Sequence, residues 1–161
     1  MFTNKALLIE KIVASLDAEL ALLTQSARAA HEEATHEQSR AENKYDTRGL
    51  EASYLAKGQS RKIVETLAAR EEFAAFQARK FGPEEAIDVG AVVELEGNGG
   101  TALYFIGPRA GGTEIVHQKQ TIVVMTPQSP LGSQLVNRKQ GDRLVLEIGR
   151  TRSEYRVARV W

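Results

Sequence analysis

The sequence predicts an α+β protein, in which an N-terminal antiparallel coiled-coil hairpin of two helices precedes a small antiparallel β domain with one short helix. Two observations carry this prediction. Residues 3–81 contain no proline and only two glycines, whereas residues 82–161 contain all four prolines and every other glycine. At the same place the spacing of apolar residues changes from a helical period to alternation. We therefore expect an arm over residues 1–81 and a β domain over residues 82–161, with the boundary at Phe81-Gly82-Pro83.

The first helix is predicted by apolar residues that recur with alternating steps of four and three, a pattern that keeps one seam facing a partner helix. The seam consists of Ile9, Val13, Leu16, Leu20, Leu23, Ala27, Ala30 and Ala34. The period breaks at residues 45–49, where Gly49 accepts a positive φ and Asp46 or Thr47 can cap a following helix. We expect the chain to turn there.

The second helix is expected to resume after this turn, although its pattern is less regular. Its apolar residues are Leu50, Tyr54, Ile63, Val64, Leu67, Phe73 and Phe76. If the chain folds back near residue 47, Ala27 and Ala30 face Leu67 and Val64, so that small side chains oppose large ones. One continuous helix that dimerises is the alternative, and the turn residues favour the hairpin within one chain.

The second half predicts short strands separated by turns. Alternating apolar residues mark strands at 91–96 and 144–148, and further strands are expected at 101–106, 122–125 and 155–160. Gly97-Asn98-Gly99-Gly100 predicts a hairpin turn between the first two. Before the strand at 144–148, Ser129 is a good N-cap and Pro130 a good first residue for a short helix. Asn137 can end that helix in the left-handed region, and Gly141-Asp142 turns the chain into the next strand.

Composition excludes several classes of function. With 21 basic and 21 acidic residues the formal net charge is zero, which does not favour non-specific binding to nucleic acid. The absence of cysteine excludes disulfides and thiolate chemistry. Since neither a signal peptide nor a membrane-spanning stretch is evident, we expect a cytoplasmic, monomeric protein that does not act on membranes. No spacing of serine, histidine and aspartate indicates an autonomous enzyme.

Acidic residues gather near the predicted turn: Glu42, Asp46 and Glu51. At most helix ends such carboxylates are simply solvated. At the tip of a long arm, however, they could enter a cavity of another macromolecule, and carboxylate oxygens are the ligands that Mg²⁺ prefers.

The charge of the β half is unevenly distributed along the sequence. Residues 138–161 contain seven basic and three acidic residues, whereas residues 81–137 contain two basic and six acidic residues. This difference is typical either of ordinary surface charge or of a face that docks on an acidic protein surface.

These parts together resemble the Gre transcript cleavage and elongation factors of bacteria. The resemblance rests on Ser129-Pro130-Leu131-Gly132, the apolar pair Leu135-Val136 and Gly141-Asp142, in the order and spacing typical of that family, behind a helical hairpin. It implies an FKBP-like C-terminal domain and binding to RNA polymerase, which we expect to involve Ser129, Pro130, Leu131 and Gly132. It also implies an arm that enters the secondary channel of the polymerase, whose own active site then cleaves backtracked RNA.

The tip departs from the family pattern Asp-x-x-Glu-Asn-x-(Asp/Glu)-Tyr. Glu42-Asn43 and Tyr45 can be aligned with it, but the first aspartate then falls on Ser39 and one residue is missing. Alternatively, Asp46 and Glu51 form the acidic pair that shares Mg²⁺ with the polymerase, with Glu42 assisting. We favour the second reading because the predicted turn places that pair foremost.

Three other functions remain open at this point. The chain could occupy the polymerase channel as an inhibitor without stimulating cleavage. It could be a prolyl isomerase or chaperone, which would need an aromatic-lined pocket from Tyr104, Phe105, Tyr155 and Trp161. It could also be a coiled-coil adaptor without any role at the polymerase. In the favoured reading the chain has no cofactor of its own and reaches nucleic acid through the polymerase.

Overall fold

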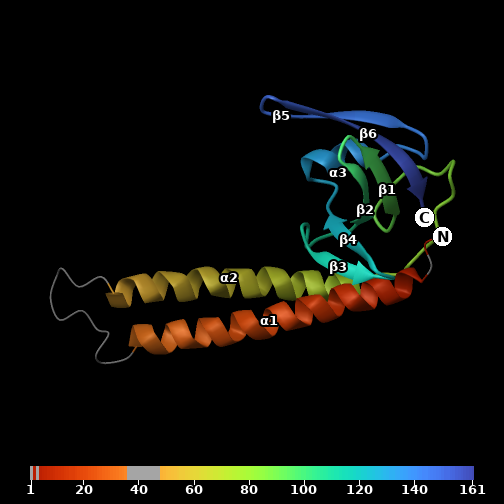
Figure 1. Cartoon of the computed structure of the whole chain (residues 1–161). Helices are drawn as coiled ribbons and strands as arrows, with labels where there is room; N and C mark the ends of the chain where they lie inside the picture. Colours follow the sequence, from red (N-terminus) through yellow and green to blue (C-terminus); the bar gives the residue numbers. More distant parts are fainter. Residues whose placement is uncertain (1, 3, 36–47) are drawn as a thin grey trace. The chain divides into compact units, whose positions relative to one another are not determined.

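The computed structural model describes residue 2, residues 4–35 and residues 48–161, and the side chains of residues 34, 35 and 48–56 are outside that description. The chain forms two compact units, one of residues 13–71 and the other of residues 1–12 with 72–161. Both units are α-helical in part, and the second contains a six-stranded sheet, so the α+β class is confirmed (Figure 1).

Two long helices are α1 (Lys5–Thr35) and α2 (Arg48–Ala75), and the unit of residues 13–71 contains all of each helix except residues 5–12 of α1 and 72–75 of α2. Among the described side chains, Gln59 Nε2 of α2 donates to Ser26 Oγ of α1 at 2.6 Å, Lys62 pairs with Glu19 at 3.6 Å, and Arg70 pairs with Asp17 at 2.9 Å. Residue numbers rise along one helix as they fall along the other, which makes the pair antiparallel. Figure 1 draws the two helices side by side.

The predicted seam of α1 is confirmed within the described side chains. Every seam residue from Ile9 to Ala30 is buried or half-buried, while most residues between them are exposed. The heptad period thus correctly identified the face of α1 that packs against α2.

The predicted seam of α2 is confirmed at Ile63 and Phe73 and wrong at Val64 and Leu67, and its predicted pairing with α1 is wrong. Val64 and Leu67 are 67% and 45% exposed, whereas Ile63 is half-buried, and the protected face also includes the polar residues Gln59 and Thr66. A seam with two polar residues does not stand out as an apolar period. With Ser26 beside Gln59, Ala27 and Ala30 do not face Leu67 and Val64.

The limits of α2 also differ from the prediction at both ends. The helix begins at Arg48, so Arg48 and Gly49 are helical rather than part of the turn, and residues 45–47 lie outside the described residues. Compared with alanine, a glycine such as Gly49 lowers the stability of a helix by only about 1 kcal/mol, which neighbouring turns of the helix can offset. At the other end α2 stops at Ala75, well before Gly82-Pro83, and Phe81 is buried in the core of the sheet unit. The boundary at 81/82 stays a prediction.

The sheet has the strand order β3-β4-β2-β1-β6-β5. Its strands are β1 (Val92–Gly97), β2 (Gly100–Ile106), β3 (Glu114–His117), β4 (Gln120–Met125), β5 (Arg143–Ile148) and β6 (Thr151–Val160). All strand pairs are antiparallel except β2 and β4, which are parallel. The sheet is therefore mixed, and the expectation of a wholly antiparallel sheet is corrected at this one pair.

The short helix α3 (Pro130–Leu135) packs against one face of the sheet, beside β5. The core on this face is built from Phe81, Ile87, Ala91, Val93, Leu95, Ile106, Met125, Leu135, Leu144, Val157 and Val160. Alternation turns Phe105 to the opposite face, where its ring lies 6.2 Å from that of Phe73 and 6.1 Å from that of Phe76. The sheet is thus covered on both faces.

The start of α1 is fixed to the segment before β1 through Lys5. Its Nζ donates to Arg79 O at 2.6 Å and to Gly90 O at 2.8 Å, and lies 4.6 Å from the centre of the Phe81 ring. Burial and, secondarily, the nearby charge of Arg79 lower the pKa of Lys5 to about 8, against a small opposing effect of Glu85. A neutral amine still has two N–H groups for the two carbonyls.

The shifted pKa predicts how Lys5 affects the free energy of unfolding. Below pH 8 the amine is protonated in both states, so its contribution is constant. Between pH 8 and the ordinary value of 10.5 the unfolded chain binds a proton that the folded chain does not, so stability rises with pH. We expect urea unfolding to show wild type gaining stability over Lys5→Met between pH 7.5 and pH 10, with no such gain over the exposed-lysine control Lys80→Met. A difference independent of pH would contradict this.

Candidate protein-docking site

The predicted start of the short helix is confirmed at Ser129. This residue is the N-cap of α3, with φ −67° and ψ 156°, and Pro130 is the first helical residue. Ser129 Oγ accepts a hydrogen bond from Gly132 N at 3.0 Å and donates one to Thr126 O at 2.9 Å. The side chain therefore joins the helix N-terminus to the end of β4 and satisfies an otherwise unpaired backbone N–H.

Gly132 is required by this cap. A Cβ atom added there would lie 2.0 Å from Thr126 O and 2.7 Å from Ser129 Oγ, far inside contact distance. The backbone of the first turn thus passes directly against the end of β4. Ser129 and Gly132 both have structural roles in the motif.

The predicted end of the helix is also confirmed. Asn137 has φ 70° and Gly141 has φ 94°, both in the left-handed region. Asn137 N donates to Ile87 O at 2.9 Å, and Ile87 N donates to Arg138 O at 2.7 Å. These two bonds fix the chain after α3 to the segment that leads into β1.

An apolar groove of about 270 Å³ borders the cap. It is lined by Gly111, Gly112, Val123, Val124, Met125, Thr126, Ser129, Pro130, Leu131, Leu146 and Ile148. Of the four residues predicted to bind polymerase, Ser129, Pro130 and Leu131 therefore lie on one hollow, whereas Gly132 is buried beneath it. Ile148 is 58% exposed, and such a side chain on the rim of a groove is a candidate contact for a partner.

Sequence reasoning missed Ile148 as part of this surface. Its alternation with Leu144 and Leu146 predicted only that it lies in a strand, and of these three residues Leu144 is buried. Toward the end of β5 the strand becomes exposed, so the same face that packs on α3 at Leu144 reaches solvent at Ile148. No local sequence signal marks where along a strand burial ends.

The predicted acidic tip lies almost entirely outside the described residues. This holds for Glu42 and Asp46, while Glu51 belongs to α2 but its side chain is not described. Within the described part of the chain, no group of three or more histidine, aspartate or glutamate side chains could hold a metal ion. The Mg²⁺-binding role of the three carboxylates therefore stays a prediction.

Comparison with known proteins gives similarity only to solved structures. No protein-family model matches the sequence, and no curated protein matches it. The fold is similar to GreA factor homolog 1 (Gfh1) of Thermus thermophilus, with 21% identity over 92% of this chain and 94% of that one and a TM-score of 0.38. It is likewise similar to Thermus aquaticus Gfh1, with 22% identity over 94% and 92% of the two chains and a TM-score of 0.40. These scores carry no functional assignment.

The four aromatic residues named for an isomerase pocket lie in different surroundings in the structure. Phe105 is fully buried between strands and α2, and Trp161 lies against Phe2 with ring centres 5.8 Å apart. Tyr104 and Tyr155 pack against the core, where burial raises the pKa of Tyr104. Of these four residues only Tyr155 lines a described cavity, and arginines share that cavity with it.

Across the described ranges, neither long helix has an apolar stretch sufficient to cross a bilayer.

Proposed function

We propose that this protein regulates transcription elongation by binding RNA polymerase. The observation that carries the proposal is the apolar groove beside the Ser129 cap, because it joins three residues of the Gre-like motif to an exposed apolar side chain. The cap, the left-handed Asn137 and the Gly141 turn all have the geometry expected from that motif. A partner that binds there would cover Ile148, which is 58% exposed in the free protein.

The antiparallel helices supply the second part of the proposal. At 1.5 Å per residue, α1 and α2 are each at least about 40 Å long, sufficient for a probe that enters the secondary channel. Among the described residues, the Gln59–Ser26 hydrogen bond, the ion pairs of Lys62 and Arg70 and the α1 seam hold the two helices together. The protein would act as a monomer in the cytoplasm, with nucleic acid reached through the polymerase.

The acidic residues Asp46, Glu51 and Glu42 would act at the far end of this probe. Hard carboxylate oxygens suit Mg²⁺, and a host site that already contributes ligands needs only one or two more. A Mg²⁺ ion so held would stabilise charge during hydrolysis of backtracked RNA by the polymerase. The protein is in this view a modulator of another enzyme's active site, not an enzyme.

The direction of regulation depends on the tip. The tip can be aligned with the family pattern in two registers, one of which places Ser39 at the first aspartate, so two outcomes follow from the same docking. With Asp46 and Glu51 as ligands the protein stimulates RNA cleavage, whereas a tip that does not hold Mg²⁺ occupies the channel and inhibits.

Purified stalled elongation complexes test the proposal. We expect wild type to bind core polymerase at micromolar concentration or below, and the double variant Asp46→Ala/Glu51→Ala to bind equally but lose the effect on RNA cleavage or elongation. Glu65→Ala removes an exposed carboxylate from the shaft of α2 and should behave as wild type. Faster cleavage with wild type identifies an activator, and slower elongation or cleavage identifies an inhibitor. Undetectable binding at about 10 µM, where a useful complex should form, would overturn the proposal.

A further inference from the structure

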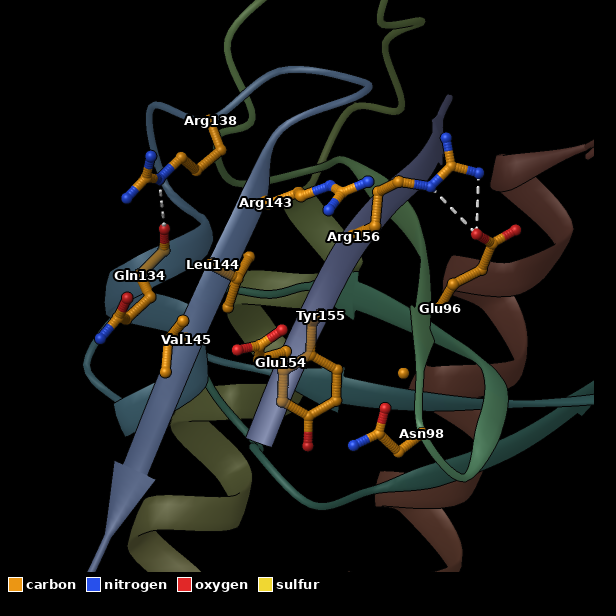
Figure 2. A pocket seen from close by; sticks show the side chains of 11 residues that line it. Glu96, Asn98, Gln134, Arg138, Arg143, Leu144, Val145, Glu154, Tyr155 and Arg156 are labelled. Carbon is orange, nitrogen blue, oxygen red and sulfur yellow. Dashed lines mark hydrogen bonds and ion pairs between the residues drawn. The ribbon is translucent and has the colours of Figure 1, made fainter. Parts of the chain in front are cut away.

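Two arginines lie opposite each other on neighbouring strands of the sheet, and one of them is paired with a carboxylate. Arg143 on β5 is the cross-strand partner of Arg156 on β6, and Arg156 is the partner of Glu96 on β1. Glu96 Oε2 accepts hydrogen bonds from Arg156 Nε at 3.1 Å and from Nη2 at 2.8 Å. Figure 2 shows the side chain of Arg143 extending toward Arg156. Like charges directly opposite on antiparallel strands are destabilising. An anion bound between Arg143 and Arg156 would reduce this repulsion.

Nearby carboxylates are engaged elsewhere. Asp142 Oδ2 accepts from Lys139 N at 2.9 Å within its own turn, and Glu154 pairs with Arg152 at 3.5 Å. Arg143 forms no ion pair with any carboxylate in the described part of the chain. The cluster therefore has at least one guanidinium group available to a ligand.

A third arginine lies on the same cavity. Arg138 follows α3, and its Nε donates to Gln134 O at 3.3 Å, which leaves its terminal nitrogens available (Figure 2). Its backbone is fixed by the bond between Ile87 N and Arg138 O. Arg143 is fixed similarly, because Val157 N donates to Asp142 O at 2.8 Å just before it. Little ordering of the backbone would be needed for binding.

The cavity that contains these arginines has a volume of about 670 Å³, within the usual range for small-molecule sites. Its other polar side chains include the amides of Asn98 and Gln134, and Tyr155 adds an aromatic ring. Planar guanidinium forks match phosphate oxygens in pairs. Amides and an aromatic ring are groups that can contact a nucleoside.

We propose that this cavity binds a phosphate-bearing small molecule of nucleotide size, with Arg143 and Arg156 on the phosphates and Arg138 on the opposite side. An acidic peptide suits it less well. Glu96 and Glu154 also line the cavity and would repel the successive carboxylates of an acidic peptide. A compact phosphate group can instead lie close to the arginines. The site is separate from the apolar groove and does not depend on binding to polymerase.

Isothermal titration of the full chain with pyrophosphate, tripolyphosphate and ATP tests this site. We expect saturable binding of one molecule per chain and a loss of about tenfold or more in affinity for Arg143→Ala, as removal of a charged hydrogen bond implies. Arg150→Ala removes the same charge from the turn between β5 and β6, outside the cavity, and should change affinity less than about twofold. Both arginines are exposed, so unchanged thermal unfolding should confirm that the variants fold.

Three outcomes would overturn the proposal. Binding that does not saturate by about 1 mM with any of the three probes excludes a specific site. Equal losses in Arg143→Ala and Arg150→Ala indicate attraction by diffuse charge. Saturable binding of hexaglutamate without binding of pyrophosphate identifies an acidic peptide as the occupant instead.

Discussion

Gly132→Ala is expected to destabilise the protein by about 2–4 kcal/mol, the sum of an overpacked contact and a disturbed N-cap. The added Cβ would lie 2.0 Å from Thr126 O, an atom that already accepts hydrogen bonds from both N and Oγ of Ser129. Relief of the clash therefore requires movement of the cap itself. The sign is informative, because glycine to alanine inside a helix ordinarily stabilises by about 1 kcal/mol.

Thermal and urea unfolding measure this effect. A change of that size lowers the melting temperature of a chain of this length by about 5–15 °C. Gly99→Ala is the matched control, since nothing lies within 4 Å of the Cβ it would add and its effect should stay within about 0.5 kcal/mol. If the two variants melt alike, the close approach of α3 to β4 is not as described.

The sequence predicted well the features that depend on residues close together in the chain. The cap at Ser129, the left-handed Asn137 and the turn at Gly141 each follow from the chemistry of one or two residues. The seam of α1 follows from its heptad spacing, which places the apolar residues on one face of the helix whichever helix packs against it. Local conformation and amphipathic pattern are encoded within a few residues, so sequence alone suffices for them.

Features that depend on distant pairing were missed. Strand β3 joins β4 through Gln118 and Lys119, with φ 51° and 64°, a conformation for which sequence rules expect asparagine or glycine. The parallel pairing of β2 with β4 depends on how the intervening hairpin crosses the sheet. In α2, the polar residues Gln59 and Thr66 occupy the protected face, and their side-chain oxygens Gln59 Oε1 and Thr66 Oγ1 are buried without hydrogen-bond partners.

In the candidate sites too, residues within a local motif were predicted, whereas residues brought together by strand pairing were not. Pro130 and Leu131 could be named from the motif, but the groove also needs Ile148, which approaches them only through the packing of β5. The basic C-terminal segment was evident, yet its seven cations give no hint that Arg143 meets Arg156. That meeting requires β6 to lie between β1 and β5, an order set by the whole sheet.

Ile148→Asp is expected to weaken binding to RNA polymerase by about a hundredfold, because a carboxylate placed in an apolar contact must lose its water without gaining a partner. Ile148 is 58% exposed at the end of β5, so the same change should alter the free energy of unfolding by only about 0.5 kcal/mol. Loss of binding without loss of stability is the combination that identifies a contact surface. Affinity measured with core polymerase, together with urea unfolding of the free protein, separates the two.

Val116→Asp provides the matched control for that experiment. Val116 is 66% exposed on the edge strand β3, so the variant introduces the same charge on an apolar exposed residue that does not line the groove. We expect Val116→Asp to bind polymerase as wild type does. Equal weakening by both variants would show that added negative charge anywhere on the sheet unit opposes binding, and wild-type affinity of Ile148→Asp would exclude the groove as the docking site. Because the tip residues play no part in this measurement, it tests docking separately from any effect on RNA cleavage.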